Sequence, residues 1–210
     1  MTELVFILDR SGSMSGLEKD TIGGFNSMIR QQKETEGQVL VSTILFDTEV
    51  QVLHDRLPLD RIPTMTERDY FARGCTALLD AVGGAIHHIG NIHKYARKED
   101  VPEKTMFVIT TDGLENASRR YDYRTVKQMI ERQQKRYGWE FLFLGANIDA
   151  AAEARRFGIP TERAVDYRPD AAGTALNFDG ISAAVKNVRT SRPVGTSWRS
   201  QIDAHYNRED

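Results

Sequence analysis

The chain has 210 residues, of which 40% are apolar and 28% are charged. This length suits one well-buried domain and is short for two, and the composition is that of an ordinary globular protein. The formal net charge of −2 offers no basic field for nucleic acid, and the single cysteine, Cys75, excludes an internal disulfide or a cysteine-based zinc site.

The apolar segments are too short for export or membrane insertion. The first of them, residues 4–8, follows an acidic residue and is shorter than the core of a secretory signal. No segment approaches the ~18 residues of a membrane span. We therefore expect a cytoplasmic protein that has no membrane or nucleic-acid partner.

The first quarter of the chain predicts a strand, a helix and a hairpin. Residues 4–8 are all apolar, a pattern typical of a central strand that is buried on both faces. Residues 17–34 carry apolar side chains at helical spacing. Residues 39–46 and 49–57 are separated by two polar residues, which predicts two antiparallel strands joined by a tight turn.

The rest of the chain alternates helical patterns with short strands. The predicted helices cover residues 76–95, 123–137, 150–157 and 173–189. The predicted strands cover residues 104–110, 139–144 and 162–166. Residues 190–210 are polar and contain a proline and a glycine, which predicts a loose tail after a domain of residues 1–189.

This alternation predicts an α/β fold with a doubly wound, mostly parallel six-stranded sheet and helices on both faces. The hairpin adds one antiparallel strand, which we expect at an edge of the sheet. Ligands of such sheets bind beyond the carboxyl ends of the strands. The functional residues should therefore lie in the loops at that edge.

Three segments at this edge carry oxygen-bearing side chains. The loop after the first strand contains Asp9, Ser11 and Ser13, the segment before the second helix contains Thr76, and the loop after residues 104–110 contains Asp112. Hydroxyl and carboxylate oxygens suit a hard cation such as Mg²⁺, with Mn²⁺ or Ca²⁺ as alternatives. Two carboxylates balance the ion formally while the hydroxyls are neutral, so the ion remains electrophilic toward an Asp or Glu of a partner protein.

The order of these residues resembles the von Willebrand factor A domain and its metal-ion-dependent adhesion site. That site combines Asp-x-Ser-x-Ser in one loop with a threonine in a second and an aspartate in a third. The runs SGSM at residues 11–14 and TDGLEN at residues 111–116 also look like those of small bacterial intracellular members. The resemblance covers residues 1–189.

The resemblance implies a Rossmann-like sheet with strand order 3-2-1-4-5-6. It implies that the two serines and the threonine contact the metal, with the aspartates acting often through water. It also implies metal-assisted protein binding rather than catalysis.

Other interpretations of the same residues stay open. Asp9 and its serines could form a cap and a turn, Thr76 could be the N-cap of the second helix, and Asp112 could be a turn residue. We favour the metal site because three separate loops agree with it.

Several neighbours have two possible roles. Glu115 and Asn116 could contact a partner, although we favour a structural role at the rim of the site. Arg10 could contact an acidic partner or be a solvated surface charge. We expect Cys75 to be a small buried residue.

Three histidines lie on the second predicted helix, at positions 87, 88 and 93. The one-turn spacings that would bring two of them onto one face are absent. We therefore expect His87, His88 and His93 to be surface or hydrogen-bonded residues rather than zinc ligands.

Two other functions compete with protein binding. A Mg²⁺-dependent phosphatase-like hydrolase would place an aspartate after a buried strand, but Ser11 stands where such enzymes carry a second acidic residue. We therefore expect no enzyme activity. A scaffold with a purely structural metal is the third possibility.

Overall fold

The computed structural model describes residues 1–208. The strands are β1 (Thr2–Asp9), β2 (Val39–Phe46), β3 (Val50–Pro58), β4 (Lys104–Thr111), β5 (Glu140–Gly145) and β6 (Ala164–Asp166). The helices are α1 (Glu18–Lys33), α2 (Leu78–Tyr95), α3 (Tyr123–Tyr137), α4 (Ala150–Arg156), α5 (Ala171–Arg189) and α6 (Ser200–Tyr206). None of the helices within these residues combines the length and the apolar character that crossing a membrane requires.

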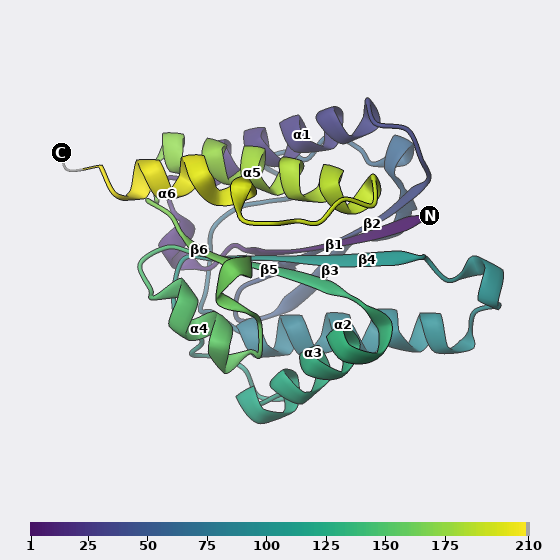
Figure 1. Ribbon diagram of the computed structural model, residues 1–210. Coiled ribbons are helices and arrows are strands. Elements are labelled where there is room, and N and C mark those ends of the chain that lie inside the picture. Colours follow the sequence, from purple (N-terminus) through teal and green to yellow (C-terminus); the bar gives the residue numbers. More distant parts are fainter. Residues whose placement is uncertain (209–210) are drawn as a thin grey trace.

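The strands form one six-stranded sheet in the order β3-β2-β1-β4-β5-β6. All neighbouring strands are parallel except β3, which runs antiparallel to β2 at the edge. Helices α1, α5 and α6 lie above the sheet and α2, α3 and α4 lie below it (Figure 1). The predicted fold class and the position of the antiparallel strand are confirmed.

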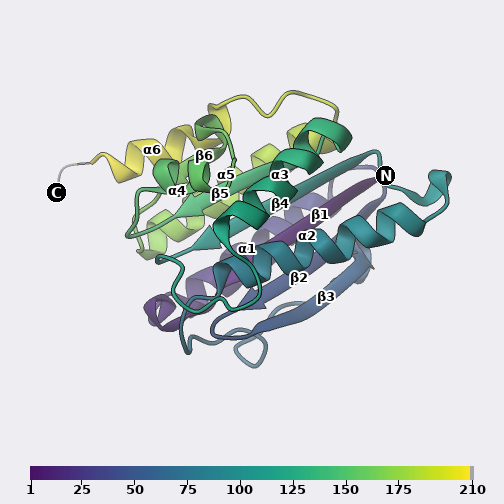
Figure 2. The same ribbon diagram turned by 90° about the horizontal axis from the view of Figure 1, so that it is seen from below.

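Strand β1 explains why the sheet is covered on both faces. Leu4, Phe6 and Leu8 join the core between the sheet and helices α1 and α5, whereas Val5 and Ile7 join the core between the sheet and helices α2 and α3. All five side chains are fully buried. Each such burial stabilises the fold by about 1.5–3 kcal/mol. Figure 2 shows the second layer, with α2 and α3 lying across the sheet.

The prediction that residues 190–210 form a loose tail is wrong for residues 194–206. Val194, Trp198 and Ile202 are buried and belong to the core beneath α5. They recur every four residues, as one face of a helix does, and polar neighbours hide this stripe in the sequence. A Cβ added to Gly180 on α5 would lie only 2.7 Å from the Trp198 carbonyl oxygen, so α5 has a notch where this segment packs. Residues 209 and 210 lie outside the described residues.

The register of the sheet brings the candidate loops together. Asp9, the last residue of β1, pairs with Phe46 on β2, and the preceding residue pairs with Thr110 on β4. The chain therefore leaves β1, β2 and β4 at one edge, which is the carboxyl edge of the parallel strands. The loops that begin with Arg10, Asp47 and Asp112 start side by side.

Candidate metal site

Asp9 ties the loop after β1 to the loop after β4. Its Oδ1 accepts a hydrogen bond from the Ser11 amide at 2.7 Å. Its Oδ2 accepts hydrogen bonds from the Thr111 hydroxyl at 2.7 Å and the Asp112 amide at 3.2 Å. Only 1% of Asp9 is exposed. Because both carboxylate oxygens are engaged inside the protein, Asp9 supplies negative charge and holds the two loops in place.

Three hydroxyl groups converge beside this carboxylate. The Oγ atoms of Ser11 and Ser13 lie 3.1 Å apart, within hydrogen-bond distance. A Cβ added to Gly113 would lie 3.8 Å from both Ser13 Oγ and Thr76 Oγ1. The structure thus brings the hydroxyls of two separate loops to one place, next to the loop that carries the second aspartate.

Backbone contacts fix the position of Thr76. Its amide donates to Asn116 Oδ1 at 2.8 Å, and its carbonyl oxygen accepts from the amides of Asn116 and Ala117 at 3.0 and 3.2 Å. Helix α2 begins at Leu78 with Ala77 as its N-cap, so Thr76 is not the helix cap of the alternative interpretation. Its hydroxyl therefore has no capping role.

Asp112 is the second carboxylate of the site and is 3% exposed. Its Oδ1 accepts a hydrogen bond from Asn147 Nδ2. Burial, with a smaller contribution from the negative charge of Asp9, raises the pKa of Asp112 to about 6 against the lowering effect of the hydrogen bond from Asn147. Burial also raises the pKa of Asp9. A divalent cation between the two carboxylates would relieve this cost of holding buried like charges together.

These residues fit a hard divalent cation. Three hydroxyl oxygens and two carboxylates from three loops form the oxygen-rich donor set that Mg²⁺ prefers, and Mg²⁺ usually completes such a set with retained waters. Within residues 1–208, no group of three or more His, Cys, Asp and Glu side chains could hold a metal ion. The candidate site differs from such a group because it combines serine and threonine hydroxyls with two carboxylates.

Arg10 is neither a partner contact nor a solvated charge, and both interpretations of it are wrong. It is 1% exposed, its Nε donates to Asp47 Oδ2 at 2.7 Å, and its Nη1 donates to Gln51 Oε1 at 2.8 Å. The Asp47 carboxylate also accepts from Arg73 Nε at 2.9 Å. No local pattern indicates this arrangement, because Asp47 and Arg73 come from other loops.

Cys75 is exposed, so the expectation of a small buried residue is wrong. Gly74 has a left-handed φ of 68°, and the Cys75 amide donates to Thr48 Oγ1 at 2.9 Å. The loop is therefore held by its backbone. A tight turn at Gly74 leaves the thiol at the surface.

Glu115 is a structural residue at the rim of the site, as expected. Its carboxylate accepts hydrogen bonds from the amides of Leu79, Ala117 and Ser118 at 2.7–2.9 Å. These contacts fix the loop after β4 to the start of α2. Asn116 has the related role of clamping Thr76.

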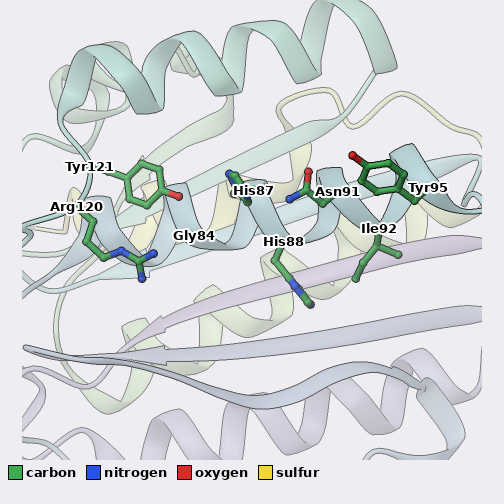
Figure 3. Close-up of a pocket in the computed structure, with 8 residues that line it drawn as sticks. All are labelled: Gly84, His87, His88, Asn91, Ile92, Tyr95, Arg120 and Tyr121. Atoms are coloured by element: carbon green, nitrogen blue, oxygen red, sulfur yellow. The ribbon is translucent and has the colours of Figure 1, made fainter.

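The three histidines of α2 behave as surface or hydrogen-bonded residues, as expected. His88 Nε2 lies 2.9 Å from Asp55 Oδ1, and His93 Nε2 lies 2.5 Å from Glu3 Oε2. His87 is exposed and, with His88, lines an open groove of about 510 Å³ along α2. Figure 3 shows this groove, with Tyr121 at one end and Tyr95 at the other. None of the five candidate metal ligands lines it.

No family model and no curated protein sequence matches the chain. Solved structures do match it. The D319A mutant of the PilB minor pilin from Streptococcus sanguinis is 13% identical with a TM-score of 0.61, and the match covers 91% of this chain and 63% of the pilin. The SpRpn10 VWA domain is 12% identical with a TM-score of 0.57, and the match covers 93% of this chain and 97% of that domain.

A third structural neighbour carries a metal. Proximal thread matrix protein 1 from the mussel byssus, in a structure with a zinc-occupied MIDAS motif, is 12% identical with a TM-score of 0.58. The match covers 85% of this chain and 46% of the byssus protein. The chain thus spans less than two thirds of the pilin and about half of the byssus protein. Together these neighbours show that the chain has a von Willebrand factor A-like fold.

Proposed function

We propose that this chain is a metal-ion-dependent protein-binding module. Ser11, Ser13 and Thr76 ligate a divalent cation directly, while Asp9 and Asp112 act chiefly through charge and bound water. The cation is Mg²⁺, with Mn²⁺ or Ca²⁺ as alternatives, and it binds an Asp or Glu carboxylate of the partner. The single observation that carries this proposal is the convergence of hydroxyls from two loops beside two buried carboxylates.

Exposure supports an ion that is open to a partner rather than purely structural. Ser13 is exposed, and Leu114, two residues after Asp112, is 56% exposed. An ion held between Ser13 and Thr76 would therefore keep one side toward solvent. With neutral hydroxyls as its direct ligands, the ion would attract an anionic oxygen on that side.

No catalytic role is part of this proposal. A phosphatase-like reaction needs a general acid near the first aspartate, and Ser11 occupies that position. The proposal also places the protein in a bacterial cytoplasm, where an exposed thiol such as Cys75 stays reduced.

Calorimetric titration of the chelator-treated protein with Mg²⁺, Mn²⁺, Ca²⁺ and Zn²⁺ tests the metal site. Ser13→Ala and Thr76→Ala should each weaken binding at least about tenfold, equivalent to 1.4 kcal/mol, and Asp9→Ala with Ser11→Ala should abolish it. Ser15→Ala is the matched control, because this exposed serine lies two residues beyond Ser13. Equal affinity of the Ser13→Ala and Ser15→Ala variants would overturn the proposal.

A further inference from the structure

Besides the proposed metal ion, the loops of the candidate metal site carry a cationic side chain, that of Arg73. Arg73 lies three residues before Thr76, and its side chain is 46% exposed. Its amide donates to the Arg10 carbonyl oxygen at 2.8 Å, and the next residue, Gly74, accepts from the Gly12 amide at 3.1 Å. The loop that carries Arg73 is therefore attached to the loop that carries the two serines.

The charge of Arg73 is only partly compensated. Asp47 Oδ2 accepts from Arg73 Nε at 2.9 Å, but the same oxygen accepts from the buried Arg10 at 2.7 Å. Glu49 adds an electrostatic attraction but forms no ion pair with Arg73. Two guanidinium groups thus share one carboxylate. Within the described residues, neither Nη atom of Arg73 donates a hydrogen bond to the protein.

Phe71 holds the exposed guanidinium in place. Its ring centroid lies 5.4 Å from the guanidinium carbon of Arg73 and 5.6 Å from that of Arg10. Such contacts attract a cation to the face of the ring and limit the freedom of the arginine. Phe71 is itself 42% exposed, so it offers an apolar surface next to the two free nitrogen atoms.

The spacing suits one continuous segment of a partner. Three residues of extended chain span at most about 11 Å, which bounds the backbone distance between Arg73 and Thr76. Side chains two residues apart on an extended strand point the same way and lie roughly 7 Å apart. An arginine side chain is long enough to make up the difference between this side-chain spacing and the backbone distance from Arg73 to Thr76.

We infer that Arg73 is a specificity-determining residue that binds a second carboxylate of the partner. The preferred partner segment is extended and carries two acidic residues two or three positions apart, with one carboxylate on the metal ion and the other on the Nη atoms of Arg73. An apolar side chain near the second acid packs on Phe71. This inference rests on the proposed function, because the first carboxylate needs the metal.

Synthetic peptides test the inference directly. The probe is a nine-residue peptide with one central Asp. It is compared with peptides that carry a second Asp one, two or three residues further along. Each two-acid peptide has a control peptide in which Asn replaces the second Asp. Affinities are measured by NMR titration of ¹⁵N-labelled protein in saturating Mg²⁺. The wild type should bind the best two-acid peptide about three- to tenfold more tightly than its Asn counterpart.

Arg73→Gln should remove this preference while the affinities for Mg²⁺ and for the one-acid peptide stay unchanged. The matched control is Arg119→Gln, an exposed arginine on the loop that follows Asp112, which should keep the preference. Equal binding of two-acid and one-acid peptides to the wild type, or an equal loss of the preference in both variants, would overturn the role of Arg73. Neither result would contradict the proposed function. Failure of every peptide to bind the metal-loaded wild type would overturn the proposed function together with this inference.

Discussion

Replacing Asp112 by Asn should stabilise the metal-free protein while destroying its response to metal. The pKa of Asp112 is raised from 3.8 to about 6. At 1.36 kcal/mol per unit, this shift corresponds to a penalty of at most about 3 kcal/mol for the ionised form. Solvent reaches the site at the exposed Ser13, so we expect about 1–2 kcal/mol. The new amide oxygen still accepts the hydrogen bond from Asn147.

The pH dependence follows from the sign of the shift. A carboxyl with a raised folded-state pKa is harder to ionise in the folded protein, so its charge opposes folding. The penalty is absent below the unfolded pKa of roughly 3.9 and complete above about 6. The advantage of the Asp112→Asn variant should therefore grow between these pH values and stay constant up to about pH 8.

Thermal unfolding in a chelator at pH 4.5 and pH 8 measures this effect. At pH 8 the Asp112→Asn variant should melt about 2–8 °C above the wild type, with a much smaller difference at pH 4.5. Millimolar Mg²⁺ should raise the Tm of the wild type and leave that of the variant unchanged. Asp179→Asn, the same change on an exposed residue of α5, should have neither effect. A variant that melts below the wild type at pH 8 in chelator would refute the reasoning.

Two further substitutions test how the loops and the C-terminal segment are held. Glu115→Ala leaves the amides of Leu79, Ala117 and Ser118 without their acceptor, and it should lower the free energy of unfolding in urea by about 2–4 kcal/mol. A loss below about 0.5 kcal/mol would show that water replaces the Glu115 carboxylate as the acceptor for these amides. Trp198→Ala should cost about 3–5 kcal/mol, because its side chain is 3% exposed in the core beneath α5. A neutral effect would contradict the packing of that segment.

The sequence predicts those parts of the fold whose signals are local. Helix α3 has the predicted bounds because Asp122 caps its start and Gly138, with a φ of 66°, ends it. The strand at residues 4–8 is recognisable because the two cores leave no polar position in it. The packing of the segment around Trp198 cannot be recognised in the sequence, because its apolar residues stand singly among polar ones and their partners lie on α5 and in the core beside it.

The candidate site divides in the same way. Five oxygen-bearing residues can be found from their order along the chain, because each follows or precedes a regular element. The burial of Arg10 and the exposure of Cys75 could not be predicted, because they depend on Asp47 and Thr48 in the loop after β2. Asn147 donates a hydrogen bond to Asp112 and has a left-handed φ of 55°, and no sequence motif predicts either feature.

The hydrogen bonds of the site indicate which groups an arriving ion must displace. The three donors to Asp9 come from the protein itself, so this carboxylate and the loops it joins are held in place by the protein alone. Asp112 has one side-chain partner, Asn147, and the Ser11 and Ser13 hydroxyls bond to each other. In the proposed site, an ion that replaces the contact between the two serine hydroxyls gains two of its direct ligands without moving the sheet. Such preorganisation would reduce the entropic cost of the proposed binding of the ion and of a partner's carboxylate.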